Sequence, residues 1–298
     1  MDDRAFHLGL AIWGYKGWLG ELFPRGSRAS DLLPLYTARF SCVEGNTTFY
    51  AIPDDRTVAR WAAQMPSGFK FCPKLHQSIS HQGPLHPRLG AALAFHDRLQ
   101  VIGDRLGPFM LQLPPRYGPS QFDDLHQFLQ GWTAARLATS LAIEVRHRDW
   151  FTPKATIQLT ALLEDLGLGW ALLDSRPIYE GPPSPSLEAL PDRQREKKPR
   201  LPLQPIVTTD YAIVRYISHP DPERNLSYYR TWVEQIRAWL RQGIQVYFFV
   251  HCPIEEHSPR NARAFQAALE TAISIPPLGW NQLPVTHAPA AQLDLFEG

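Results

Sequence analysis

Eight short apolar runs, each followed by a segment with helical periodicity, recur along this chain. The runs are rich in β-branched and aromatic residues and cover residues 7–12, 41–44, 69–72, 109–113, 141–145, 169–173, 211–216 and 245–250. Strands that alternate with helices form parallel sheets, because each helix carries the chain back to the start of the next strand. Eight such units in 298 residues predict a single-domain TIM-type (β/α)8-like barrel, with an open doubly wound sheet as the alternative.

The helices between these runs follow from residue spacing and from start signals. Residues 54–65 place Val58, Trp61, Ala62 and Met65 on one face, which is typical of a helix that packs on a sheet. Leu159, Leu162, Leu163 and Leu166 form a second such face, in a helix that Thr152-Pro153 would begin. Further helices are expected near 30–39, 88–103, 121–130, 228–242 and 259–273, with Ser120 and Ser258 as N-caps.

One long segment, residues 176–209, interrupts the alternation after the sixth strand. It is rich in proline and has no period, so we expect a mobile insertion and the most protease-sensitive interior part of the chain. Its basic cluster either contacts phosphate groups or is a solvated loop; its members are Arg193, Arg195, Lys197, Lys198 and Arg200 around Glu196. The predicted barrel covers residues 1–275, and residues 276–298 are predicted to be a disordered tail.

Composition and charge narrow the class of protein. The chain is 44% hydrophobic and 20% charged, which is typical of a soluble globular protein. No apolar run could cross a bilayer, and residues 1–4 do not begin a secretory signal. Cys42, Cys72 and Cys252 lack the spacing of a disulfide scaffold or a zinc site, so we expect a cytoplasmic protein. The formal net charge of +1 lacks the basic excess that nucleic-acid-binding proteins usually show.

Polar residues gather where the predicted strands end, and in a TIM barrel the chemistry occurs at that end. Buried charges are costly unless they are paired or used, so their convergence predicts a pocket. For a single pair, such as Glu144 with Arg215, a structural ion pair at the rim is an equal alternative. The predicted catalytic residues are Glu44, Lys74 and Glu144, and the predicted substrate-binding residues are Asn46, Tyr50, His76, Gln112, Arg146, Asp174 and Arg215.

The residue types in this pocket favour an anionic ligand over a metal ion. Lys74, Arg146 and Arg215 are suited to hold a phosphate, whereas they would repel a cation. A divalent metal is therefore not favoured as a cofactor, although suitable ligand types are present in Glu44, His76, Glu144, His147, Asp174 and His251.

The strand order also predicts which residues meet. Lys74, Glu144 and Arg215 come from strands three, five and seven, and alternate strands contribute to the same layer of a barrel, so Glu144 should pair with one of the two cations. Glu144 or Glu44 would serve as general base or acid. If Glu44 is less well paired, it is the better candidate for the acid.

Several motifs together resemble the YecE-like proteins, domain-of-unknown-function family 72. They are VEGNTTFYAIP (43–53), FKFCPKLHQSISH (69–81), LQLPPRY (111–117), AIEVRHRDWF (142–151), IVRYISHP (213–220) and VYFFVHCPIEEHSPRNA (246–262). The resemblance spans about residues 7–273 and implies a TIM-like barrel of no established activity. It also implies functional positions at Glu44, Asn46, Thr48, Phe49, Tyr50, Lys74, His81, Gln112, Pro114, Glu144, Arg146, Trp150, Asp174 and Arg215.

This chain departs from the family pattern at two loops. It has Ile217-Ser218-His219-Pro220 where the family usually has His-Gly after the strand-seven arginine. It has His251-Cys252 where the family often has paired asparagines after strand eight. Contacts at these two loops are therefore not carried over from the resemblance.

The C-terminal pentapeptide Gln292–Phe296 (QLDLF) resembles the peptide by which bacterial DNA polymerases and repair proteins dock on the replication sliding clamp. Leu293, Leu295 and Phe296 would fill an apolar pocket, with Asp294 facing outward. Residues 276–291 have the composition of a tether. The alternative is an amphipathic tail that packs on its own domain.

These observations predict a bacterial enzyme that acts on a phosphorylated or nucleic-acid-derived substrate and is recruited to DNA, with a role in repair, by the sliding clamp. A nuclease-like or phosphodiesterase-like hydrolase is one form of this hypothesis. The alternatives are a non-catalytic DNA-associated adaptor and a sugar or sugar-phosphate isomerase whose tail only resembles a clamp peptide.

Overall fold

The computed structural model describes residues 4–182, 184–189 and 198–282. Eight parallel strands lie in the order β3-β2-β1-β8-β7-β6-β5-β4. They are β1 (Phe6–Leu10), β2 (Cys42–Gly45), β3 (Lys70–Pro73), β4 (Phe109–Gln112), β5 (Leu141–Glu144), β6 (Gly169–Asp174), β7 (Tyr211–Ile217) and β8 (Gln245–His251). Each predicted run matches one strand to within two residues at either end, and the predicted TIM-type barrel is confirmed.

The barrel closes between β3 and β4, where the contacts are sparser than between the other neighbouring strands. An isolated bridge joins Lys74 to Met110, and Gly107 N donates to Phe71 O at 2.8 Å. A Cβ atom at Gly107 would lie 2.6 Å from Cys72 Sγ. The close approach of the two strands therefore requires glycine at this position.

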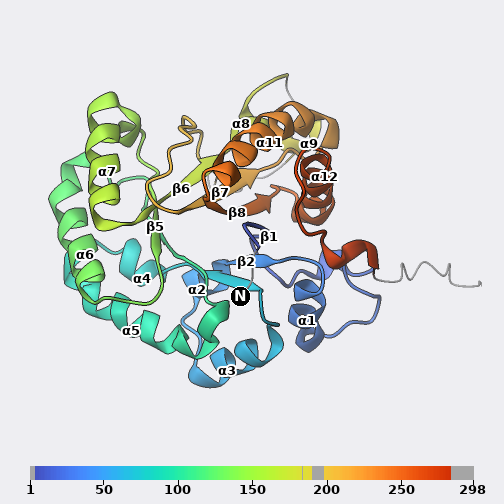
Figure 1. Cartoon of the computed structure of the whole chain (residues 1–298), viewed down its shortest axis with the longest axis horizontal. Helices are drawn as coiled ribbons and strands as arrows, with labels where there is room; N and C mark the ends of the chain where they lie inside the picture. Colours follow the sequence, from blue (N-terminus) through green and yellow to red (C-terminus); the bar gives the residue numbers. More distant parts are fainter. Residues whose placement is uncertain (1–3, 183, 190–197, 283–298) are drawn as a thin grey trace, which may run out of the picture.

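Helices form a ring around the strands (Figure 1). They are α1 (Leu32–Thr37), α2 (Asn46–Tyr50), α3 (Asp55–Gln64), α4 (Gln77–Ser80), α5 (Leu89–Leu99), α6 (Phe122–Ala134), α7 (Pro153–Leu166), α11 (Leu226–Arg241) and α12 (Ser258–Glu270). The short helices α2 and α4 are not predicted from the sequence, because a single turn is too short to show a period.

The predicted N-caps are correct at one helix and wrong at two. α7 begins at Pro153 directly after its N-cap Thr152, as predicted. Ser258 is the first residue of α12 and not its N-cap. Ser120 lies inside a 3-10 turn that Pro119 opens, and α6 therefore starts only at Phe122.

Apolar side chains pack on both sides of the strands. The larger cluster fills the space between the strands and the helices and includes Trp132, Trp232 and Phe248. The smaller cluster fills the inside of the barrel and consists of Cys42, Cys72, Met110, Ala142, Ala171, Tyr211, Ile213, Tyr247 and Phe249. The barrel interior is thus packed with side chains and is not a pore.

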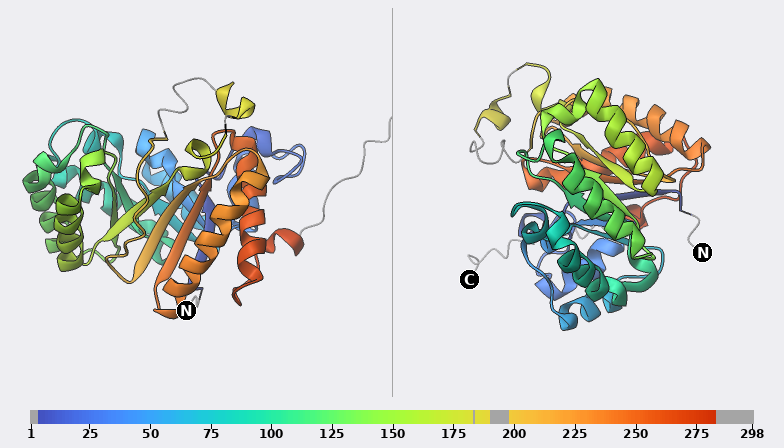
Figure 2. Two further views of the ribbon diagram at one scale, coloured as in Figure 1. Left: turned by 90° about the horizontal axis from the view of Figure 1, so that it is seen from above. Right: turned by 90° about the vertical axis from the view of Figure 1, so that its left-hand side faces the viewer.

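The insertion after β6 contains two short helices, α8 (Arg176–Tyr179) and α9 (Pro185–Glu188), which the sequence does not predict. In the left view of Figure 2, this yellow segment stands at one end of the barrel, opposite the N-terminus. The chain that returns from the insertion packs on the barrel through Leu201, which is buried with Leu173 and Ile217. The predicted protease sensitivity of the insertion stays a prediction.

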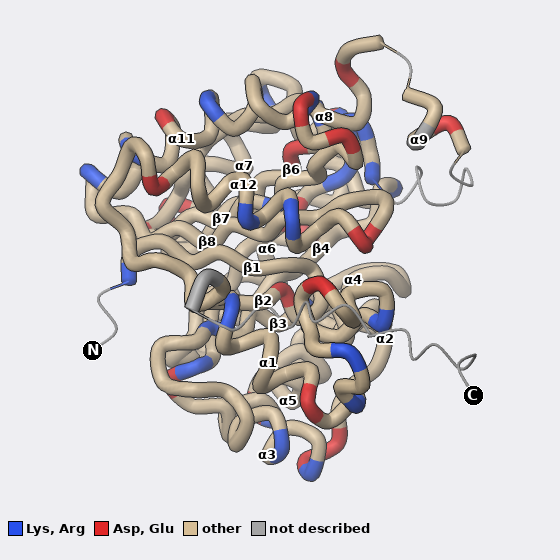
Figure 3. The backbone as a smooth tube through the Cα atoms, turned by 90° about the vertical axis from the view of Figure 1, so that its right-hand side faces the viewer, with Lys and Arg blue, Asp and Glu red and all other residues tan. Residues whose placement is uncertain are grey.

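Three further features bear on the class of protein. The cysteines Cys42, Cys72 and Cys252 are buried free thiols. Among the residues that the structure describes, no helix combines the length and the apolar character needed to span a bilayer. Lys and Arg segments are interspersed with Asp and Glu segments on the side of the molecule that Figure 3 shows, in keeping with the balanced net charge.

Candidate functional site at the barrel mouth

The candidate site is a layer of polar side chains at the C-terminal mouth of the barrel. Along a strand, every second residue faces the same side. Two residues after the interior positions Cys42, Cys72, Met110, Ala142, Ala171, Ile213 and Phe249 come Glu44, Lys74, Gln112, Glu144, Leu173, Arg215 and His251. Six of these seven side chains are polar, and all seven are buried. The strand period therefore stacks a polar layer directly on the apolar interior.

Arg215 of β7 bridges the two buried glutamates. Its Nε and Nη2 atoms donate to the two oxygens of Glu44 at 2.8 and 2.9 Å, and its Nη1 atom donates to Oε2 of Glu144. A planar guanidinium is suited to such forked contacts with carboxylates. Residues from β2, β5 and β7 are thereby joined at one end of the barrel.

Arg146 and Lys74 meet at the amide of Gln112. Arg146 donates from Nε to Oε1 of Glu144 and from Nη2 to Oε1 of Gln112, the latter at 2.9 Å. Lys74 Nζ donates to the same amide oxygen at 2.6 Å and lies 3.7 Å from Oε1 of Glu44. These contacts close a ring of charged side chains around the mouth.

Helix α2, directly after β2, holds Lys74 in place. The Thr48 hydroxyl donates to Lys74 O at 2.7 Å and accepts from Lys74 N at 3.1 Å. The ring centroid of Phe49 lies 4.9 Å from Lys74 Nζ, within the range of a cation–π contact. Both the backbone and the amine of Lys74 are therefore positioned by this short helix.

His251, at the end of β8, extends the ring toward the insertion. Its Nε2 atom lies 2.9 Å from Oε2 of Glu44, and its Nδ1 atom lies 3.4 Å from Nζ of Lys198. A neutral imidazole with its proton on Nε2 satisfies both contacts, since it donates to the carboxylate and accepts from the amine. Burial lowers the pKa of His251 to about 3, which is consistent with the neutral form.

Glu44 and Glu144 stay ionised at neutral pH. Burial alone would raise the pKa of each, but the nearby cations have the larger combined effect. Arg215 is the main cation that holds the pKa of Glu44 well below 4.5, while Arg146 and Arg215 lower the pKa of Glu144 to about 2. Glu44 is thus as well paired as Glu144, and the condition under which it would be the acid is not met.

The pKa of Lys74 is lowered toward neutral pH. Burial is the largest cause, and Arg215 adds to it, so the pKa falls from 10.5 to about 7 despite the attraction of Glu44 and Glu144. The residue is 3% exposed. An amine with this pKa exists in both protonation states near neutral pH, as an acid–base catalyst requires.

Three of the predicted binding residues lie at the rim, outside the ring of charges. Asn46 and Tyr50 belong to α2, and Tyr50 is 62% exposed. His76 caps α4, because its Nδ1 atom accepts from Ser78 N at 3.2 Å. These three side chains surround the mouth without joining the buried network.

Asp174 faces away from the mouth. It is one residue out of phase with Leu173 and therefore points from β6 toward the surrounding helices. Its Oδ2 atom accepts from Trp232 Nε1 of α11 at 2.8 Å and from Arg176 Nη2 at 2.9 Å. The structure does not bring Asp174 together with the other predicted site residues.

The ring offers little to a metal ion. Within the described parts of the chain, no group of three or more His, Cys, Asp or Glu side chains is placed to hold one. The oxygens of Glu44 and Glu144 all accept hydrogen bonds from guanidinium or imidazole groups. A metal here would have to displace these donors.

Comparison with known proteins places the chain in a family. The model of the family described as "Protein of unknown function DUF72" matches residues 7–285. The chain belongs to the DUF72 family. The UPF0759 protein YecE of Escherichia coli K12 is 32% identical to this DUF72 chain over 254 residues, which cover 85% of this chain and 88% of YecE. The resemblance seen in the sequence is confirmed.

Solved structures of other DUF72 proteins share the fold. One from Enterococcus faecalis matches with a TM-score of 0.67 at 18% identity, over 91% of this chain and 98% of that chain. One from Thermotoga maritima matches with a TM-score of 0.64 at 20% identity, over 89% of this chain and 99% of that chain. These structural similarities support the barrel fold and do not indicate an activity.

Two further positions that the DUF72 resemblance implies are His81 and Trp150. The first lies beside the site, and the second belongs to the structure that supports it. His81 packs edge-on against Phe49, with ring centroids 5.0 Å apart, and burial followed by Arg146 lowers its pKa to about 4. Trp150 is buried and donates from Nε1 to Tyr117 O at 2.8 Å, which is a structural contact.

The loops after β7 and β8 meet in the structure. Ser218 Oγ donates to the backbone oxygen of His251 at 2.6 Å, and Asn261 Nδ2 donates to Ser218 Oγ at 2.8 Å. The loop after β7 therefore supports His251 at the end of β8.

Two residues near the mouth are not predicted from the sequence. By composition, Lys198 belongs to a basic cluster, yet its amine turns toward His251. Glu255 lies in the loop after β8, beyond the strand ends from which the site was predicted. Strand periodicity carries no information about loop residues, so it does not predict that either side chain lies near the mouth.

Proposed function

We propose that this protein is an enzyme that acts on a phosphorylated or nucleic-acid-derived substrate at the C-terminal mouth of its barrel. In this proposal Lys74 transfers the proton, while Glu44 and Glu144 remain ionised and hold the guanidinium groups in place. The observation that carries the proposal is a buried lysine whose protonated form adds a positive charge to a ring whose other charges cancel.

The charge count supports an anionic substrate. Arg146 and Arg215 carry two positive charges that balance those of Glu44 and Glu144. Lys74 is left with a neutral amide oxygen as its hydrogen-bond acceptor, at 3.7 Å from the nearest carboxylate oxygen. A buried cation without a full partner is unfavourable, so an anion at the mouth would be stabilised there.

The ring also fits the chemistry of phosphate esters. A bound anion would raise the pKa of Lys74, because negative charge favours the protonated amine. When water attacks the phosphorus and the P–O bond to the leaving group breaks, the amine could donate its proton to the leaving oxygen of a phosphate ester. Arg146, 11% exposed and the most open of the ring's charged side chains, would stabilise the charge on the phosphoryl oxygens.

A binding experiment tests the anion site directly. Inorganic phosphate should bind the full-length protein in calorimetry near neutral pH, and Lys74→Met should weaken binding about tenfold or more, since a charge-assisted contact is lost. The matched control is Lys154→Met, which removes an exposed lysine on α7. Equal phosphate affinity for Lys74→Met and wild type would contradict the proposal.

A turnover experiment tests the enzymatic part. Bis(p-nitrophenyl) phosphate reports hydrolysis of a phosphodiester, and ribose 5-phosphate reports isomerisation. Lys74→Met should lose whichever turnover the wild type shows while it keeps its fold. Phosphate binding without any turnover would favour the non-catalytic adaptor.

We also propose that the tail recruits the barrel to DNA through the bacterial sliding clamp, which would give the enzyme a role in DNA repair. Residues Gln292, Leu293, Asp294, Leu295 and Phe296 lie outside the described residues, and the support is the sequence pattern alone.

A synthetic peptide tests the tail. The segment 286–298 should bind a bacterial clamp with micromolar affinity, about −8 kcal/mol. Substitution of both Leu295 and Phe296 by Ala removes the apolar anchors and should abolish binding. Comparable binding by the doubly substituted peptide would remove the basis for clamp recruitment.

A further inference from the structure

Lys198 reaches the mouth from the insertion, and the backbone around it is anchored. The Tyr179 hydroxyl donates to Lys198 O, and Ser175 Oγ donates to Pro199 O at 2.8 Å. Its amine lies 3.4 Å from His251 Nδ1 and forms no ion pair with any described residue. The amine is therefore held at the mouth with donors to spare.

Glu255 approaches the mouth from the loop after β8, where it opens the 3-10 helix η8 (Glu255–His257). The loop after β1 fixes this turn, because Trp18 Nε1 donates to Glu255 O at 2.9 Å and the Tyr15 hydroxyl donates to Glu256. The Oε1 atom of Glu255 is nevertheless buried and has no well-aligned hydrogen-bond donor among the described residues, although Ser258 lies close enough to lower the pKa of the carboxyl. An unsatisfied buried carboxylate oxygen is costly, so a donor from a ligand would be favourable there.

We propose that Lys198 and Glu255 form a second subsite of the mouth, which binds a hydroxyl group and makes the substrate a sugar phosphate. This inference rests on the proposed function, since the phosphate group would occupy the Lys74 end of the ring. A hydroxyl is the neutral group that donates one hydrogen bond and accepts others. Here it would donate to Oε1 of Glu255 and accept from Nζ of Lys198.

The two ends of the mouth are linked through two intervening side chains. Glu44 lies 3.7 Å from Lys74 and 2.9 Å from His251, and His251 lies 3.4 Å from Lys198. A sugar phosphate presents its phosphate and its hydroxyl groups several bonds apart, so one molecule could contact both ends.

The charge of the second subsite also favours a neutral group over a second anion. Burial raises the pKa of Glu255 to about 7 against the attraction of Lys198, and burial together with Arg215 lowers the pKa of Lys198 to about 8. The other charged groups that act on this pair are Glu44, Glu256 and Arg146. Near neutral pH the pair carries little net charge, unlike the Lys74 end of the ring.

The test compares two phosphates on the full-length protein by calorimetry near neutral pH. Ribose 5-phosphate carries hydroxyl groups and ethyl phosphate carries none. The wild type should bind ribose 5-phosphate about tenfold or more tightly, as expected for hydrogen bonds to charged groups. Glu255→Gln and Lys198→Met should each reduce this preference and leave the affinity for ethyl phosphate unchanged.

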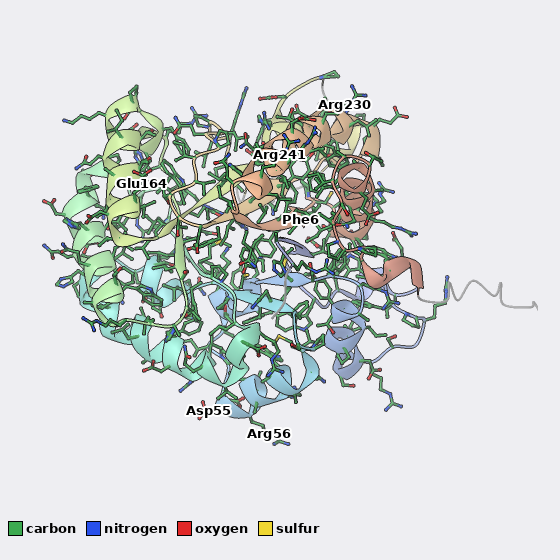
Figure 4. All side chains as sticks on the ribbon, in the orientation of Figure 1. Phe6, Asp55, Arg56, Glu164, Arg230 and Arg241 are labelled. Carbon is green, nitrogen blue, oxygen red and sulfur yellow. The ribbon has the colours of Figure 1, made fainter. Side chains whose placement is uncertain are left out.

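Two controls accompany these variants, Glu164→Gln and Lys154→Met, both at exposed positions of α7; Glu164 is labelled in Figure 4. If both phosphates bind the wild type equally, or if the two subsite variants keep the preference, the second subsite is overturned while the anion site stands. If neither phosphate binds, the proposed function itself fails. The wild-type comparison decides the matter even if a variant does not fold.

Discussion

The two halves of the barrel mouth differ in how completely their charges are paired. In one half, every oxygen of Glu44 and Glu144 accepts a hydrogen bond, and Arg215 joins the two. In the other half, Lys198 and Glu255 form no ion pair, and one oxygen of Glu255 has no well-aligned donor among the described residues. The pKa values diverge accordingly, to about 2 for Glu144 and about 7 for Glu255.

This difference indicates which buried charges act as a scaffold and which are available for chemistry. A fully paired carboxylate is locked in its ionised form and fixes the geometry of its partners. A charge with an incomplete set of partners has a pKa closer to neutrality, and a ligand can complete its contacts. Lys74 belongs to the second class although it lies in the first half, since its acceptor is a neutral amide.

The largest expected effect concerns the paired half. Glu144→Gln should lower the free energy of unfolding by about 3–5 kcal/mol, because it leaves buried guanidinium charge without its partner. Urea unfolding measures this change, and the exposed Glu164→Gln should change stability by no more than about 0.5 kcal/mol.

The stability of Glu144→Gln also determines how its activity should be interpreted. A drop in activity of Glu144→Gln would not by itself identify a catalytic residue, because the fold is weakened as well. A loss of stability below about 1 kcal/mol would instead show that the carboxylate is not a scaffold element.

A smaller effect per pH unit is expected for Lys74→Met, in the direction of unchanged or higher stability. The folded-state pKa of Lys74 is about 7 against 10.5 for the ordinary amine, so between these values the folded protein binds fewer protons than the unfolded chain. Stability should therefore rise with pH across this window by up to about 1.4 kcal/mol per pH unit, and the variant should lack this contribution. Unfolding free energies of both proteins across the window measure it; parallel pH profiles would show that the amine titrates normally.

The smallest effect is expected at Glu255, whose pKa is raised from 4.5 to about 7. Between these values the folded protein binds more protons than the unfolded chain, so the contribution of Glu255 is present below 4.5 and is lost as the pH rises through 7. The stability of the wild type relative to Glu255→Gln should fall across this window. The same measurement on Glu164→Gln provides the control, and a flat difference between wild type and Glu255→Gln would mean that the carboxyl is not perturbed.

Much of the site could be predicted from the sequence because it follows the strand period. Glu44, Gln112 and Glu144 each stand two residues after an interior position, and strand ends mark the mouth of a barrel. The same period, applied with its phase, excludes Asp174, which is three residues after Ala171 and therefore on the other face. Asp174 was included because strand-end residues were chosen without regard to phase.

Other parts of the site could not be predicted. The turn of Lys198 toward His251 depends on the anchors Tyr179 and Ser175, which lie far from it along the chain. The approach of Glu255 depends on Trp18, from the opposite end of the sequence. Loop residues of this kind have no period that would reveal their direction.

The sequence by itself determined the eight strands, the longer helices around them and the layer of polar residues at the mouth, because each depends on near neighbours along the chain. Only the tertiary structure decided which charge pairs with which. Arg215 and Glu44 are 171 residues apart, yet they share two hydrogen bonds. Pairing of this kind depends on distances across the closed barrel, and those distances set whether a buried charge is locked or available to a substrate.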